Sequence, residues 1–117
     1  MKIKEIKAIL NASFLCGEDK QEADCMAGCG CDLMSDVLAF PKERMCLLTG
    51  LTNAHVIRTS EMLDVVCVVF VRGKQPPQDA LELALELGLA VLSTDCTLYE
   101  ACGKLYAHGL PGKNEAV

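Results

Sequence analysis

The stretch Met45-Cys46-Leu47-Leu48-Thr49-Gly50-Leu51-Thr52-Asn53 decides the fold that this sequence predicts. Its apolar run ends at Thr49-Gly50, and a helical pattern begins after Asn53, which is typical of a strand that leads into a helix. Two later apolar runs, residues 65–71 and 89–92, also end at polar or glycine-containing turns before helices. Three such units predict an α/β fold of three layers, with a mainly parallel sheet flanked by helices.

The segments before this stretch complete the pattern. Apolar residues recur at helical spacing over residues 2–10, and the apolar run 12–16 predicts a strand. Residues 23–30 are small and rich in cysteine, and their period of two favours another strand. Residues 32–40 predict a helix that ends at Pro41, because the residue before a proline avoids helical angles.

Turn residues predict where the later helices begin. We expect Thr52 or Asn53 to cap the helix after the first central strand, with Met62 on its apolar side. Pro76 and Pro77 suit the first turn of the next helix, where a missing N–H group costs nothing.

The last predicted helix runs to about residue 108. Its N-cap candidates are Ser93, Thr94 and Asp95. We expect residues 1–112 to form a single domain and residues 113–117 to be a loose tail.

Composition excludes several classes of protein. Of the 117 residues, 51% are hydrophobic, which is too many for a disordered chain. The net charge of −5 argues against nucleic acid, whose phosphates need a basic face. No apolar run is long enough to span a membrane, and the first residues are charged, unlike a secretion signal. We therefore expect a cytoplasmic protein whose eight cysteines are mostly reduced.

If the three central strands are parallel, the turns after them meet at one edge of the sheet, where such folds bind ligands. Helix N-termini and two basic side chains there would suit a nucleotide or another small anion. The alternative is ordinary capping and turn chemistry, which explains the same residues. The candidate ligand-binding residues are Thr49, Gly50, Thr52, Asn53, Arg72, Gly73, Lys74, Ser93, Thr94 and Asp95.

A second candidate site is a set of thiolates for zinc or an iron–sulfur cluster. Cys25, Cys29 and Cys31 are close in sequence, and Cys16 is a further ligand candidate. Their spacing matches neither zinc ribbons nor common ferredoxins. On a strand, Cys25 and Cys29 would share a face about 13 Å apart, too far for one small ion. The alternative is small side chains that pack beneath a helix.

Two further possibilities concern catalysis and self-association. Covalent catalysis would need a cysteine with His55 or His108 as base, but no nearby carboxylate would orient either ring. We therefore expect no enzyme and no catalytic residues. Apolar surface that the helices leave uncovered favours a homodimer, formed by the helix at 32–40 or by a sheet edge.

The chain resembles the DRTGG domain family, whose fold is related to the N-terminal domain of HPr kinase/phosphorylase. The resemblance spans nearly the whole chain. Four stretches carry it: Cys31-Asp32-Leu33-Met34-Ser35-Asp36-Val37-Leu38, Leu47-Leu48-Thr49-Gly50, Ala84-Leu85-Glu86-Leu87-Gly88-Leu89-Ala90-Val91-Leu92-Ser93-Thr94 and Leu98-Tyr99-Glu100-Ala101-Cys102-Gly103-Lys104-Leu105-Tyr106. The last of these is similar to stand-alone DRTGG proteins encoded near iron-only hydrogenases in anaerobic bacteria.

The resemblance implies a non-catalytic, dimeric regulatory module that senses a small anionic ligand or docks to a partner, with a hydrogenase or related redox system as its setting. Two departures from the family pattern affect the site. Leu51, Thr52 and Asn53 stand where an arginine commonly follows the Thr-Gly turn. Only Gly73 matches the later Thr-Gly-Gly turn. The alternative function is a cysteine-based metal or iron–sulfur protein.

Overall fold

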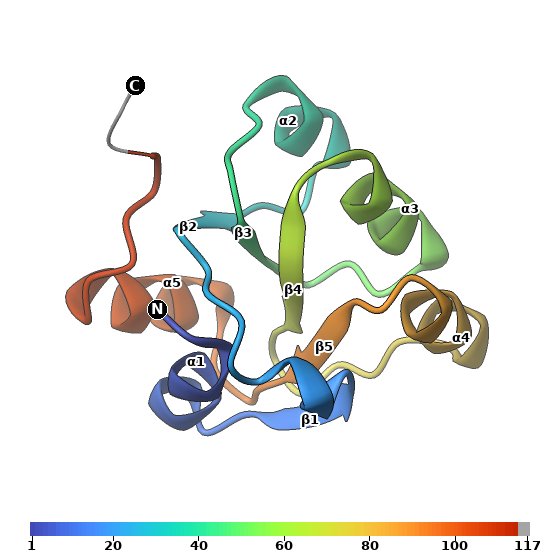
Figure 1. Cartoon of the computed structure of the whole chain (residues 1–117), viewed down its shortest axis with the longest axis horizontal. Helices are drawn as coiled ribbons and strands as arrows, with labels where there is room; N and C mark the ends of the chain where they lie inside the picture. The colour runs from blue at the N-terminus through green and yellow to red at the C-terminus, as the bar shows by residue number, and fades with distance from the viewer. Residues whose placement is uncertain (115–117) are drawn as a thin grey trace.

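A computed structural model of the chain describes residues 1–114 and contains one five-stranded sheet with helices on both faces (Figure 1). The strand order is β1-β5-β4-β3-β2. Strands β2 to β5 are mutually parallel, and β1 pairs antiparallel with β5. The predicted fold class and the common direction of the three central strands are therefore confirmed. The strands are β1 Ser13–Cys16, β2 Ala27–Gly30, β3 Met45–Thr49, β4 Val65–Phe70 and β5 Ala90–Ser93.

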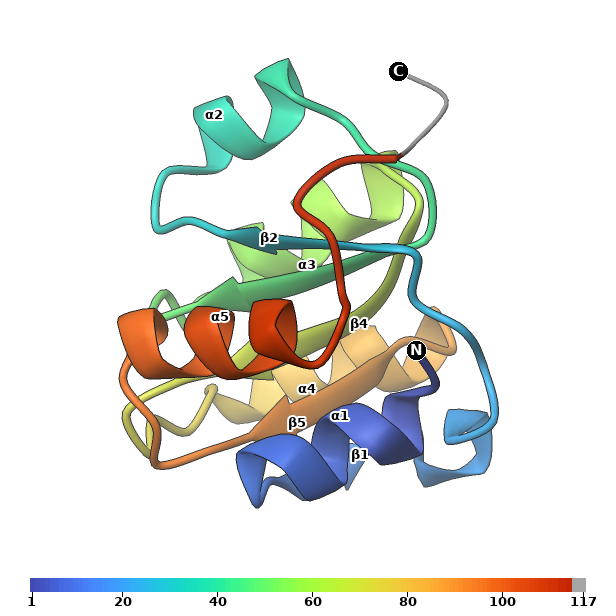
Figure 2. The same cartoon turned by 90° about the vertical axis from the view of Figure 1, so that its left-hand side faces the viewer.

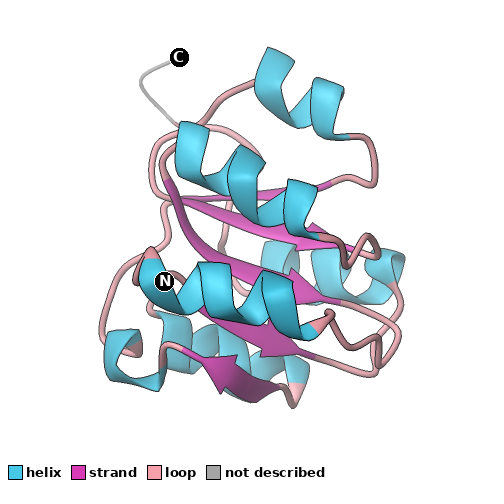
Figure 3. Cartoon of the chain, turned by 90° about the vertical axis from the view of Figure 1, so that its right-hand side faces the viewer, coloured by secondary structure: helices cyan, strands magenta, loops and turns pink. Residues whose placement is uncertain are grey.

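The helices form the two outer layers (Figures 2 and 3). Helices α1 and α5 cover one face of the sheet, and α3 and α4 cover the other (Figure 2). Helix α2 packs over the second face at its β2 end. Their bounds are α1 Ile3–Leu10, α2 Met34–Ala39, α3 Ala54–Met62, α4 Gln78–Glu86 and α5 Leu98–Ala107, with a short 3-10 helix at Glu18–Lys20.

The central strands are mostly apolar because both of their faces are buried. All five residues of β3 are buried. Cys46 and Leu48 face the core beneath α1 and α5, whereas Met45 and Leu47 face the core beneath α2, α3 and α4. This alternation is the pleat of a strand covered on both sides.

Strand β2 is shorter than predicted. Its pairing with β3 begins only at Ala27. Asp24 instead forms an isolated antiparallel bridge with Lys2, so the preceding segment follows the N-terminal residues. Cys25 therefore lies outside the strand and in the core beneath α1 and α5, whereas Cys29 packs against the opposite core. The expectation that these two side chains share a face was wrong.

Three predictions about the helices also need correction. The N-cap of α5 is Thr97 and not one of the predicted residues at 93–95; the Ser93 and Thr94 hydroxyls donate to the Lys74 and Leu10 carbonyls instead. Pro77 is the N-cap of α4, so both prolines precede the helix. Met62 is 71% exposed, and Thr59 and Ser60 are buried instead.

The C-terminal residues run back along the β2 edge of the sheet. The Gly28 amide donates a hydrogen bond to the Pro111 carbonyl at 2.8 Å. The Glu43 amide donates to Asn114 Oδ1 at 2.8 Å. The rest of the predicted tail, residues 115–117, lies outside the described residues. Within residues 1–114, none of the helices combines the length and apolarity that a membrane crossing requires.

Candidate functional site

The carboxyl ends of the four parallel strands meet at one edge of the sheet, called here the C-terminal edge. It comprises residues 31–32, 49–53, 72–75 and 93–96, which follow β2, β3, β4 and β5. Backbone hydrogen bonds join these segments: the Gly73 amide donates to the Thr94 carbonyl at 2.8 Å, and the Val71 amide to the Thr49 carbonyl at 3.1 Å. The structure thus brings the predicted ligand-binding residues to a common edge.

Asp32 organises this edge, although the sequence pattern placed it inside a helix. It lies two residues before α2. One carboxylate oxygen, Oδ1, accepts hydrogen bonds from the Thr49 hydroxyl at 3.0 Å and from the Gly50 amide at 2.7 Å. The Thr49 hydroxyl oxygen in turn accepts from the Leu51 amide at 3.1 Å. The turn between β3 and α3 is therefore held by a side chain from the neighbouring strand exit.

Arg72 lies directly over the glycine of that turn. A methyl group added to Gly50 would come within 2.5 Å of Arg72 Nη2 and 3.5 Å of Asp32 Oδ1. Arg72 and Gly73 both adopt left-handed backbone angles, with φ of 58° and 65°. Gly73 lies close to Asp95, whose carboxylate oxygen would be 2.9 Å from a methyl group added there. The edge therefore combines a guanidinium with two carboxylates.

Several predicted ligand contacts are engaged within the protein. Thr94 is buried, and its hydroxyl donates to the Leu10 carbonyl at 2.7 Å. The Ser93 hydroxyl donates to the Lys74 carbonyl at 3.3 Å. By contrast, Asn53 caps α3 without a side-chain hydrogen bond, and in the first turn of that helix the Val56 amide donates to the Asn53 carbonyl at 3.2 Å. Arg72, Lys74 and Asp95 are exposed at this edge, next to the start of α3.

The cysteines proposed as metal ligands are not brought together. Cys25 and Cys29 pack against opposite faces of the sheet. The Cys31 thiol bonds locally, to the Leu33 carbonyl at 3.3 Å. Across residues 1–114, no group of three or more His, Cys, Asp or Glu side chains is placed to hold a metal ion.

Cys25 instead meets two other thiols, Cys46 and Cys67, in the core. Cys25 Sγ is 4.0 Å from Cys67 Sγ, which is 3.5 Å from Cys46 Sγ. Interactions with the Cys46 and Cys67 thiols lower the pKa of Cys25 well below that of an ordinary thiol, against the effect of burial. The interaction with Cys25, together with burial, raises the pKa values of Cys46 and Cys67. The pKa of Cys25 is therefore shifted in the opposite direction to the pKa values of the two strand thiols.

Neither histidine is paired for catalysis. His55 is exposed in the first turn of α3. The Nδ1 atom of His108 is 2.7 Å from the Lys104 carbonyl oxygen at the end of α5. Within residues 1–114, neither ring hydrogen-bonds to a cysteine or a carboxylate.

An apolar groove of about 530 Å³ lies away from most of the predicted residues. It runs between α5, β2 and residues 110–112, and the two glycines of β2 form part of its wall. Tyr99 and Tyr106, which are 89% and 73% exposed, line it from α5.

The sequence matches no family model, and no curated protein is similar to it at a significant level. The structure is similar to that of the CBS and DRTGG domains from the regulatory region of Clostridium perfringens pyrophosphatase, solved with the activator diadenosine tetraphosphate. The TM-score is 0.74 at 19% sequence identity, over 99% of this chain and 52% of that one. This chain thus spans about half the length of that protein. The likeness supports a DRTGG-like fold.

Proposed function

We propose that the chain is a non-catalytic regulatory module that senses a small anionic ligand, a nucleotide or a related phosphate compound, at the C-terminal edge. The observation that carries the proposal is the placement of Arg72 over Gly50, beside the start of α3. A guanidinium binds phosphate oxygens in pairs, and a helix N-terminus adds free N–H groups and partial positive charge.

The surrounding charges refine this proposal. Lys74 adds a second exposed cation one residue beyond Gly73. Asp32 and Asp95 lie on the same edge, so a ligand with few charges that also offers hydroxyl groups suits it better than a bare polyanion. The solved structure that this chain resembles contains a nucleotide activator in a regulatory region, and this supports a nucleotide as the first ligand to test.

Thermal unfolding in the presence of adenine nucleotides, diadenosine polyphosphates and inorganic phosphate tests the proposal. A ligand present at 100 times its dissociation constant stabilises the folded state by about 2.7 kcal/mol, which raises the unfolding midpoint by several degrees. Arg72→Ala should abolish the shift. Arg58→Ala, on the exposed side of α3, is the matched control and should retain it. The absence of a shift with every phosphate compound would leave docking to a protein as the function.

We also propose that the module is a homodimer formed through α2. Leu33 and Phe40, 57% and 67% exposed, flank this helix, and Leu38 is exposed on it. Because Pro111 already occupies part of the β2 edge, the α2 surface suits a second copy better than the bare strand does. Light scattering of the double variant Leu33→Glu/Phe40→Glu should give a monomer. Leu85→Glu, on exposed α4 surface, should leave the dimer intact. A wild-type monomer at all concentrations would refute this interface.

We further propose that residues 1–112 act as one domain in the cytoplasm, together with a hydrogenase or a related redox system. The sequence resemblance to stand-alone DRTGG proteins supports this setting. Direct binding between the purified chain and an iron-only hydrogenase would support it, and the absence of binding with and without nucleotide would count against it.

A further inference from the structure

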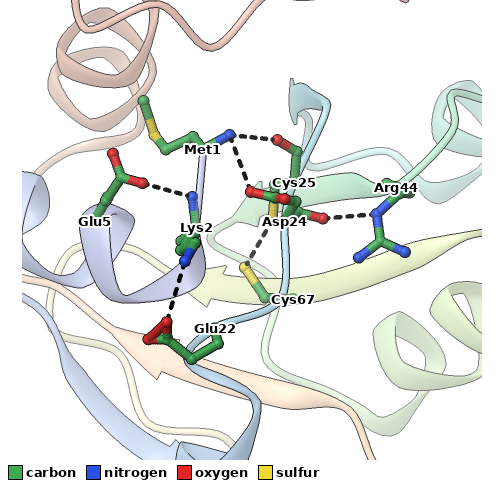
Figure 4. A network of polar contacts seen from close by, with 8 residues as sticks. All are labelled: Met1, Lys2, Glu5, Glu22, Asp24, Cys25, Arg44 and Cys67. Carbon is green, nitrogen blue, oxygen red and sulfur yellow. Dashed lines mark hydrogen bonds and ion pairs between the residues drawn. The ribbon is translucent and has the colours of Figure 1, made fainter.

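The buried thiols of Cys25, Cys46 and Cys67 come from three separate parts of the chain and are 0–1% exposed. Cys46 and Cys67 lie opposite each other in the paired central strands β3 and β4. Cys25 approaches from the irregular segment before β2 and contacts Cys67 (Figure 4). The cluster is thus made of two thiols on the rigid sheet and one on a segment outside it.

The Cys25 segment is held by a few hydrogen bonds rather than by a ladder of strand pairs. The Cys25 amide donates to the Met1 carbonyl at 2.7 Å. The Met1 amino group donates to the Cys25 carbonyl at 3.0 Å, and Arg44 Nε donates to the Asp24 carbonyl at 2.9 Å (Figure 4). Cys25 also lines a surface hollow of about 730 Å³, together with Arg44 and residues 109–111. Segments with few such contacts open locally more readily than central strands do. Cys25 is therefore the member of the cluster that an external reagent reaches first.

We propose that Cys25 and Cys67 are a redox-active pair that forms a reversible disulfide on reaction with a low-molecular-weight disulfide. The sulfur atoms are already in van der Waals contact at 4.0 Å. Closing them to bonding distance, about 2.05 Å, moves the irregular segment. Joining Cys46 to Cys67 would instead distort two central strands that are hydrogen-bonded to each other. This inference does not depend on the ligand proposed for the C-terminal edge.

The reaction is thiol–disulfide exchange in two steps. The Cys25 thiolate attacks one sulfur of the reagent RSSR, whose S–S bond breaks to release RS⁻ and leave a mixed disulfide on Cys25. The Cys67 thiol gives up its proton, attacks the Cys25 sulfur and displaces the second RS⁻. Both released thiolates take up the protons that the cysteines lost. In total, two protein thiols are oxidised and one RSSR is reduced to two RSH.

Mass spectrometry of the full chain after incubation with oxidised glutathione tests the proposal. Peptide mapping of the wild type should show a Cys25–Cys67 disulfide, which dithiothreitol removes. Cys25→Ala should lose the internal disulfide, and Cys67→Ala should stop at the mixed disulfide on Cys25. Cys46→Ala is the matched control from the same cluster and should form the disulfide as the wild type does.

Two outcomes would overturn the proposal. One is that glutathione adds only to the half-exposed thiols, Cys16, Cys29, Cys31, Cys96 and Cys102, while Cys25 stays reduced. The other is an internal disulfide between Cys46 and Cys67. The wild-type peptide map distinguishes these outcomes from the expected one even where an alanine variant fails to fold.

Discussion

The Asp32 carboxylate accepts a hydrogen bond from the Gly50 amide at 2.7 Å and so ties the exit of β2 to the exit of β3. Its second donor is the Thr49 hydroxyl at 3.0 Å. A charged acceptor from one strand thus sets the turn that starts α3 and places Gly50 beneath Arg72. The geometry of the proposed ligand site therefore depends on a residue from outside the turn.

Asp32→Ala should lower the free energy of unfolding by about 1.5 kcal/mol, because two donors lose a charged acceptor. It should also weaken any ligand that binds at Arg72. Urea denaturation measures the first effect and thermal shift the second. Asp36→Ala, an exposed acid in the first turn of α2, is the control and should change stability by less than about 0.5 kcal/mol. Equal losses in the two variants would contradict the role of Asp32.

Thr94 should be important for stability through its hydroxyl group. Thr94→Val keeps the shape but removes the hydroxyl that donates to the Leu10 carbonyl and accepts from the Cys96 amide, which we expect to cost about 2 kcal/mol. Thr94→Ser retains the hydroxyl and should lose much less. Chemical denaturation of the pair separates the hydrogen bond from packing; similar losses in both would mean that the methyl group matters instead.

The two N-caps should differ in importance. Thr97 Oγ1 accepts a hydrogen bond from the Glu100 amide at 3.2 Å, so Thr97→Ala should cost about 1 kcal/mol. Asn53 caps α3 without such a bond, and Asn53→Ala should cost less than about 0.5 kcal/mol. Denaturation midpoints check both, and the reverse ranking would show that the caps are misassigned.

Helix α5 packs on β2 so closely that Gly30 is required. A methyl group on residue 30 would overlap the Cys102 sulfur. Gly30→Ala should therefore destabilise the fold by about 1–3 kcal/mol through overpacking. Removing the sulfur with Cys102→Ala in the same chain should restore part of that loss, giving a coupling of about 1 kcal/mol in a double-mutant cycle. Strictly additive effects would rule out the contact.

The thiol cluster predicts a stability maximum in pH under reducing conditions. Folding lowers the pKa of Cys25. Its contribution to stability is therefore complete above the ordinary thiol pKa, about 8.5, and is lost as the pH falls. The pKa values of Cys46 and Cys67 are raised, so their contribution is full below that value and is lost as the pH rises. The free energy of unfolding, measured by urea denaturation over a pH series, should therefore be highest near pH 8.5.

Cys25→Ala tests the origin of the rising limb of that profile, which this variant should flatten. Cys16→Ala should keep the rising limb, because burial raises rather than lowers the pKa of Cys16. A profile that is unchanged in Cys25→Ala would show that other groups cause the pH dependence.

The fold was predictable because its strongest signals are local. Residues 45–48 and 65–71 are continuously apolar, as expected for short strands that are covered on both faces. Because the strands are parallel, their carboxyl ends could be expected at one edge of the sheet. Asp32 was missed because an acid just before an apolar helical pattern reads as part of the helix.

The thiol cluster and the apolar groove could not be predicted for a different reason. Cys25, Cys46 and Cys67 are separated by about twenty residues each, and only the register of β3 on β4 places two of them side by side. Cys25 joins them because its segment turns toward Met1, which no periodicity in residues 23–30 reveals. Contacts set by tertiary pairing leave no regular spacing in the sequence.

The hydrogen bond from Gly28 to the Pro111 carbonyl has a consequence for how the protein behaves at high concentration. An open strand edge is a template on which further chains add and grow into aggregates. Here the chain's own final turn occupies part of that template and blocks growth from the β2 side. Truncating the protein before Leu110 would expose the β2 edge, and we expect such a truncated chain to form fibrils.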